Sequence, residues 1–139
     1  MRKILVPFDG SNSATRALSY AIGLAVDIPG TELEILNVQD PVEFRSHAGS
    51  EEDIRRLQDE KGRQTAKPAC DLVEKAGLPY RLSTRAGSPA NEIAAHVHAT
   101  GCTSIIMGTR GLGLVAAYMI GSVATRVIGL VEVPVTLIK

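Results

Sequence analysis

The chain has 139 residues, of which 45% are apolar and 22% charged, and its 15 basic and 15 acidic residues give a formal net charge of zero. This length and composition indicate one globular domain, 1–139, and exclude the strongly basic surface of a typical nucleic-acid-binding protein. The sequence contains no run of 18 apolar residues and no signal-peptide pattern, which predicts a cytoplasmic protein without a membrane span.

The first half of the chain predicts two strand-helix units. A short apolar strand over 2–8 ends at Asp9-Gly10-Ser11-Asn12, which combines turn and helix-capping residues. Apolar spacing then predicts a helix over 13–27 and a partly covered strand over 31–38. The segment 39–50 has no clear periodicity and is expected to be an exposed loop. In the charged helix that follows over 51–76, Pro68 is expected to cause a kink or a split near Lys67.

The second half repeats the alternation. Polar alternates in the strand over 79–86 predict an edge position. Ser88 is expected to cap a helix that has Pro89 at its first position and ends at Gly101. A strand over 103–107, a glycine-rich loop, a helix over 121–130 and a strand over 133–138 complete the chain. Strands that alternate with helices indicate an α/β fold with a parallel sheet covered on both faces.

The histidines and cysteines show no metal-ligand pattern. His96 and His98 are two residues apart on a predicted helix and therefore point to different faces. We expect these two histidines and His47 on the surface. Cys70 and Cys102 are expected to be reduced structural cysteines.

The most informative stretch is 104–128, in which an apolar strand ends at Gly108 and a helix begins at Gly121-Ser122. Glycines allow a backbone to approach a ligand closely, and a helix N-terminus presents free amides to an anion. The spacing Gly108-x2-Gly111-x9-Gly121-Ser122 fits neither the Walker A motif nor the dinucleotide fingerprint. The alternative reading is a glycine-rich connection without a ligand.

This spacing resembles the ATP-binding signature of the universal stress protein A family. The opening Lys3-Ile-Leu-Val-Pro-Phe-Asp9-Gly-Ser11, the strand end Leu36-Asn-Val38, the turn Gly87-Ser-Pro-Ala-Asn-Glu-Ile93 and the closing Val133-Pro-Val-Thr-Leu-Ile138 also have counterparts there in the same order. The resemblance implies an open Rossmann-like sheet of five mostly parallel strands in the order 3-2-1-4-5. It also implies a crevice between the first and fourth strands, which Asp9 and Gly108 both face.

The resemblance further implies ATP, ADP or AMP as the cofactor, with Mg²⁺ or Mn²⁺ as an accompanying ion. Asp9 would accept from ribose hydroxyls or hold the ion, the Val38 backbone would meet adenine, and Gly121 and Ser122 would hold phosphate. The alternatives are a turn-forming Asp9, a core Val38 and an ordinary first-turn Ser122. The full predicted contact set is Pro7, Asp9, Val38, Met107, Gly108, Arg110, Gly111, Gly121, Ser122 and Val123.

Arg110 is the only cation in the glycine-rich loop, which is otherwise apolar between Gly111 and Gly121. Many members of the family carry basic or polar residues there. Because fast phosphoryl transfer needs cations at the developing charge, the sequence favours a nucleotide-binding regulatory module with at most slow hydrolysis. A slow ATPase, and an interaction subunit that has lost the ligand, remain alternatives.

The last strand, Val133 to Ile138, is apolar on both sets of alternates and would leave an open edge unless it were paired. Pairing with a symmetry mate, as in the family, predicts a homodimer. Pro134 limits how much of that edge can form hydrogen bonds.

Overall fold

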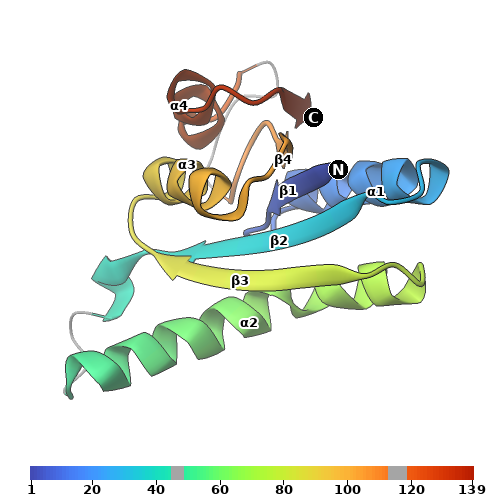
Figure 1. Cartoon of the computed structure of the whole chain (residues 1–139). Helices are drawn as coiled ribbons and strands as arrows, with labels where there is room; N and C mark the ends of the chain where they lie inside the picture. The colour runs from blue at the N-terminus through green and yellow to red at the C-terminus, as the bar shows by residue number, and fades with distance from the viewer. Residues whose placement is uncertain (45–48, 113–118) are drawn as a thin grey trace.

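The computed structural model describes residues 1–44, 49–112 and 119–139. Strands and helices alternate along almost the whole chain (Figure 1). Their bounds are β1 Lys3–Pro7, α1 Asn12–Asp27, β2 Glu32–Gln39, the 3₁₀ helix η1 Pro41–Phe44, α2 Glu51–Lys75, β3 Tyr80–Ala86, α3 Pro89–Thr100, β4 Ser104–Gly108, α4 Ser122–Leu130 and β5 Val135–Ile138.

The five strands form one sheet in the order β3-β2-β1-β4-β5. Every neighbouring pair is parallel, and β1 lies in the centre, with Ile4 opposite Leu33 of β2 and opposite Ser104 of β4. The predicted α/β class and the order 3-2-1-4-5 are therefore confirmed. Because the chain leaves β1 in one direction for β2 and β3 and later returns for β4 and β5, the strand order reverses between β1 and β4.

Two hydrophobic cores lie on opposite faces of the sheet, because successive strand side chains point to opposite sides. Ile4, Val6 and Ile35 belong to the core that includes residues of α1 and α2. Leu5 and Leu36 belong to the core that includes residues of α3 and α4. Figure 1 shows α2 beneath β3 and α3 above the middle of the sheet. Two covered faces explain why the central strands are apolar on both sides.

The long helix α2 runs without interruption from Glu51 to Lys75, so of the two outcomes expected at Pro68, a kink or a split near Lys67, the split is wrong. A capping box formed by Ser50 and Asp53 starts the helix. Pro68 is exposed, whereas residues on both sides of it, including Ala66 and Ala69, are fully buried against the sheet. Tertiary packing of this face holds the helix together where local propensity would divide it.

Two other expectations about exposure are also wrong. β2 is buried along most of its length because β1 and β3 flank it and helices pack on both of its faces, although the alternation of polar residues suggested a partly covered strand. The segment 39–50 begins with the last residue of β2 and the helix η1, in which Phe44 is 5% exposed. Residues 45–48, which include His47, lie outside the described residues.

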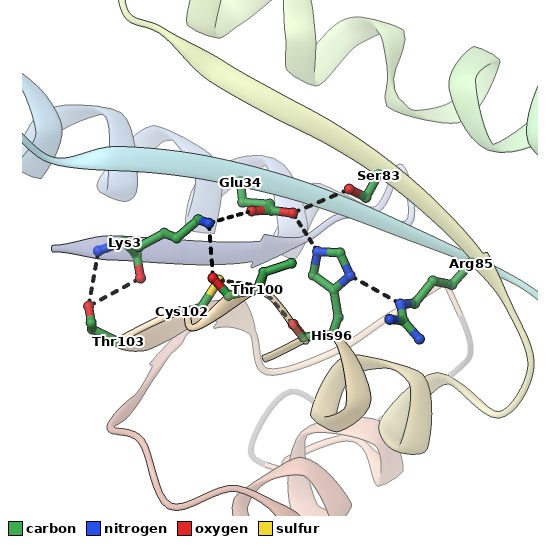
Figure 2. A network of polar contacts seen from close by, with 8 residues as sticks. All are labelled: Lys3, Glu34, Ser83, Arg85, His96, Thr100, Cys102 and Thr103. Atoms are coloured by element: carbon green, nitrogen blue, oxygen red, sulfur yellow. Dashed lines mark hydrogen bonds and ion pairs between the residues drawn. The ribbon is translucent and has the colours of Figure 1, made fainter. Parts of the chain in front are cut away.

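A buried polar cluster lies between the sheet and α3 (Figure 2). Its centre is the Glu34 carboxylate of β2, which is 2% exposed and contacts the ring of His96 from α3 at 2.5 Å. His96 is 5% exposed, so its predicted surface position is wrong. His98 is exposed, as expected. The imidazole lies inside because a carboxylate on the neighbouring element satisfies its polar nitrogen.

Candidate functional site

The carboxyl end of β1 leads into a turn that fixes the Asp9 side chain. Asp9 Oδ1 accepts a hydrogen bond from the Ser11 amide at 2.9 Å, and Ser11 Oγ accepts from the Ala14 amide at 3.1 Å and so caps α1. Gly10 has a φ of 87°, which favours glycine at this turn. The second oxygen of Asp9 faces Gly111, because a Cβ on Gly111 would lie 2.9 Å from Oδ2. Asp9 therefore shapes its turn with one oxygen and turns the other toward the glycine-rich loop.

The carboxyl end of β4 approaches α1 very closely. A Cβ on Gly108 would overlap the Ser13 hydroxyl and would lie 2.8 Å from the Ser13 carbonyl carbon. Ser13 Oγ in turn donates to the Ile138 carbonyl of β5 at 3.1 Å, and the Thr109 amide donates to the same carbonyl at 2.8 Å. Glycine is thus required at position 108 by packing between elements, a role that the sequence pattern did not reveal.

A cavity of about 290 Å³ opens where these two strand ends meet. The structure brings all ten residues of the predicted contact set to its lining. It adds eight that the prediction did not include: Phe8, Ala14, Leu36, Pro89, Ile93, Thr109, Leu112 and Ala124. Most of the added residues are apolar. The only sequence signal for their place in the lining is the periodicity that sets which face of a strand or of α3 a side chain occupies. A largely apolar cavity with a few convergent polar groups is typical of a small-molecule site.

The N-terminus of α4 forms one wall of this cavity. The Gly121 amide donates to the Thr109 carbonyl at 2.6 Å, so the expectation that this amide is free for a phosphate is wrong. The next amides, of Ser122, Val123 and Ala124, open the helix and have no acceptor within it. Gly121 occupies the N-cap position and has no side chain with which to cap them. An anion in the cavity would therefore meet uncapped amides that begin one residue later than predicted.

The lining carries little charge. Asp9 and Arg110 are the charged residues among the described lining, and together they sum to zero. Next to them, Leu112 is 73% exposed, and Met119 and Ile120 are 54% and 48% exposed. The predicted apolar stretch continues over 113–118, which lie outside the described residues. The described part of the site thus offers backbone amides and one guanidinium to an anion.

A metal ion would find few ligands from the protein itself. Within residues 1–44, 49–112 and 119–139, no three histidine, cysteine or acidic side chains come together in a way that could hold one. The donor set at the cavity contains one carboxylate, that of Asp9. Such a set fits Mg²⁺ or Mn²⁺ only when a ligand's phosphate oxygens and water complete the coordination.

Comparison with known proteins finds one family that matches the whole chain. The model of the universal stress protein family matches residues 1–139. Universal stress protein MJ0531 of Methanocaldococcus jannaschii is 32% identical over 139 residues, which cover 99% of this chain and 82% of that protein. Universal stress protein YxiE of Bacillus subtilis is 32% identical over 146 residues, which cover 99% and 98% of the two chains.

Solved structures share the fold. The structure of hypothetical protein MJ0577 has a TM-score of 0.83 and 28% identity, covering 99% of this chain and 95% of that one. A universal stress protein family protein from Arabidopsis thaliana with AMP bound has a TM-score of 0.73 at 22% identity, covering 100% and 92%. A universal stress protein in complex with cAMP has a TM-score of 0.73 at 23% identity, covering 99% and 97%.

Proposed function

Because the chain belongs to the universal stress protein family, we propose that it is a regulatory module of the stress response that binds an adenine nucleotide, preferably ATP, in the cavity between β1 and β4. The observation that carries this proposal is the convergence of Asp9, two glycines of the loop, Gly108 and Gly111, and the uncapped start of α4 on one cavity. In a parallel sheet, ligands bind at the carboxyl ends of the strands where the strand order reverses. Two structures of the same fold contain AMP or cAMP.

Each part of the nucleotide has a matching group in the lining. Asp9 Oδ2, which is not used by the turn, would accept from ribose hydroxyls or hold a divalent ion. The Val38 backbone would face the adenine edge, and the amides of Ser122 and Val123 would donate to phosphate oxygens. Arg110 adds the one cation of the described lining. Bound Mg²⁺ or Mn²⁺ would supply the remaining positive charge that a triphosphate needs.

Calorimetric titration of the purified protein with ATP, ADP and AMP, each with and without Mg²⁺, tests the proposal. Saturable heat and a rise in melting temperature are expected, because a ligand that binds the folded state stabilises it. Absence of both at millimolar nucleotide would overturn the proposal.

A Gly121→Asp variant locates the phosphate site. Aspartate is a favourable N-cap residue, so its carboxylate should cap the first amides of α4 and compete with phosphate for them. We expect ATP to bind at least about tenfold more weakly, because the carboxylate would occupy the amides that hold phosphate and would repel the phosphate charge. Adenosine, which has no phosphate, should lose much less affinity. Gly129→Asp, at a glycine with open space around it on the same helix, is the charge-matched control.

Hydrolysis is expected to be slow at most, because the described lining supplies a single guanidinium and relies otherwise on backbone amides. Sustained phosphate release by the wild type, well above that of Gly121→Asp, would favour the alternative of an ATPase. A purified protein that neither carries nor binds a nucleotide would favour the alternative of an interaction subunit.

We also propose that β5 pairs with its counterpart in a second copy to form a homodimer. β5 lies at the edge of the sheet and bonds to β4 on one side. The carbonyls of Pro134 and Ile138 accept from β4 and the residue after it, so the alternate residues Val135 and Leu137 turn their amides to the open edge. Light scattering should show a dimer at micromolar concentration. Val135→Pro, which removes one outward amide, should weaken it, and a monomeric wild type would contradict the proposal.

The cytoplasm is the proposed location. Cys70 and Cys102 are both free and buried, which agrees with a reducing compartment. In the described part of the chain, no helix is long and apolar enough to cross a membrane. Fractionation of cells that produce the protein tests the location.

A further inference from the structure

Arg85, near the end of β3, holds α3 at two points. Its Nη1 lies 3.2 Å from Glu92 Oε1, and its Nε donates to His96 Nδ1 at 3.0 Å. Glu92 and His96 are four residues apart and therefore lie on the same face of the helix. The connection from β3 is tight as well, because a Cβ on Gly87 would lie 2.9 Å from Glu92 Cγ. One guanidinium thus fixes the first two turns of α3 against the sheet.

The contacts of His96 identify the tautomer of its neutral ring. An arginine can only donate, so Nδ1 must be the unprotonated, accepting nitrogen. The ring proton then lies on Nε2, which donates to Glu34 Oε1 at 2.5 Å. Figure 2 marks both contacts of the ring with dashed lines. The bond between Arg85 and His96 therefore exists only when the imidazole is neutral.

The same part of α3 belongs to the wall of the nucleotide cavity. Pro89 and Ile93 line the cavity, and they lie within one turn of Glu92. Val38, another lining residue, is the register partner of Arg85 in the sheet. A change in how Arg85 holds α3 would therefore alter the distance between two walls of the cavity.

We propose that Arg85 and His96 are positioning residues for the nucleotide site, and that they hold the α3 wall in its binding position only while His96 is neutral. The inference rests on the proposed nucleotide binding and adds a regulation to it. Protonation would place an N–H of His96 opposite the N–H of Arg85 Nε, and two donors and two positive charges would then face each other. Nucleotide affinity should therefore fall when the protein is acidified.

The charges around His96 come from every element packed against it. β1 contributes Lys3, whose Nζ lies 3.6 Å from Glu34 Oε2, and β2 contributes Glu34 itself. β3 contributes Arg85, and also Arg81, which lines the same surface hollow as Lys3 and Glu34. α3 contributes Glu92. Among these groups, Arg85 is the one whose contact with His96 is lost on protonation, because its Nε needs the unprotonated Nδ1 as acceptor.

Nucleotide affinity measured at about pH 7.5 and about pH 5.5, the range in which histidines titrate, tests the inference. The phosphate group also changes charge near pH 6, so a matched variant is needed. His96→Gln supplies it, because a glutamine can accept from Arg85 and donate to Glu34 without titrating. We expect wild-type affinity to fall at least about fivefold more than that of His96→Gln, within the usual range of coupling between sites.

His98→Gln is the control for a histidine on the same helix, because His98 is exposed and outside the cluster. It should show the wild-type pH profile. Arg85→Lys, which cannot reach both acceptors with one planar group, should bind more weakly at both pH values and show a reduced pH dependence. If His96→Gln and the wild type have the same pH profile, the inference is wrong.

Hydrogen exchange in the nucleotide-free protein tests the positioning step separately. Acidification should lower the protection of amides in the first two turns of α3 in the wild type, after correction for intrinsic rates, and should not do so in His96→Gln. Equal protection in both proteins overturns the inference even if no nucleotide binds. Failure of the proposed function itself would appear differently, as absence of binding at every pH.

Discussion

Gly108 and Ser13 are packed so closely that α1 rests directly on the end of β4. A Cβ at position 108 would lie 2.8 Å from the Ser13 carbonyl carbon, a backbone atom that cannot move independently of its helix. Gly108 therefore has a structural requirement that is independent of any ligand.

Gly108→Ala should lower the free energy of unfolding by about 2 kcal/mol, as other overpacked core substitutions do. Urea denaturation measures the loss. Gly129→Ala is the control, because nothing lies within 4 Å of a Cβ there, and alanine in a helix should stabilise slightly. A Gly108→Ala protein as stable as the wild type would show that α1 can shift to make room.

Two substitutions of Asp9 separate its role in the turn from its role toward a ligand. Asp9→Asn keeps an oxygen for the Ser11 amide, so stability should stay close to that of the wild type while nucleotide affinity falls about tenfold or more. Asp9→Ala loses both functions and should also cost about 1 kcal/mol of stability. Titration calorimetry and thermal unfolding of both variants measure the two effects. Unchanged affinity of Asp9→Asn would limit Asp9 to shaping the turn.

Glu34→Ala should be among the most damaging single changes in the chain. It would leave the buried His96 ring and the Ser83 hydroxyl without their shared acceptor, and Lys3 without its ion-pair partner. Removing one partner from a buried pair typically costs about 3 kcal/mol or more. Asp71→Ala breaks the exposed pair with Lys67 and should change stability by less than about 0.5 kcal/mol. If chemical denaturation showed the same loss of unfolding free energy for Glu34→Ala and Asp71→Ala, burial would not explain the importance of Glu34.

Burial raises the pKa of the Cys102 thiol, although a hydrogen bond with Thr100 acts in the opposite direction. A raised folded-state pKa means that this contribution to stability is complete below the pKa of the unfolded thiol, about 8.5. The contribution is lost as the pH rises from there, because the unfolded chain releases its proton first. Urea denaturation between about pH 7.5 and 9.5 should show stability falling more in the wild type than in Cys102→Ala. If the stability of the wild type and of Cys102→Ala changed equally with pH, the pKa of Cys102 would not be raised in the folded protein.

Local patterns predicted what depends on local chemistry. The turn at Asp9, the helix start at Ser11 and the strand end at Gly108 are each encoded by neighbouring residues. The set of ten contact residues follows from the resemblance to the family, and these residues line one cavity because parallel strands end at one edge of the sheet, beside the start of α4. Their roles as ligand contacts remain predictions.

Contacts between distant segments could not be read from the sequence. Glu34 and His96 are 62 residues apart, and each alone resembles an ordinary polar position on a strand or helix. The bond between the Gly121 amide and the Thr109 carbonyl depends on the path of the intervening loop, which glycine spacing does not specify. Pro68 does not split α2, because the packing of Ala66 and Ala69, which local propensity does not include, holds the helix together.

The Ile138 carbonyl at the end of β5 is shared by two donors, the Ser13 hydroxyl and the Thr109 amide. These donors belong to α1 and to the residue that follows Gly108, so the edge strand β5 is bonded to both segments that meet at Gly108. A displacement of β5 would strain these two hydrogen bonds, and Gly108 and Thr109 belong to the cavity lining. A partner bound at the open edge of β5 would therefore be linked to the cavity lining through these two hydrogen bonds.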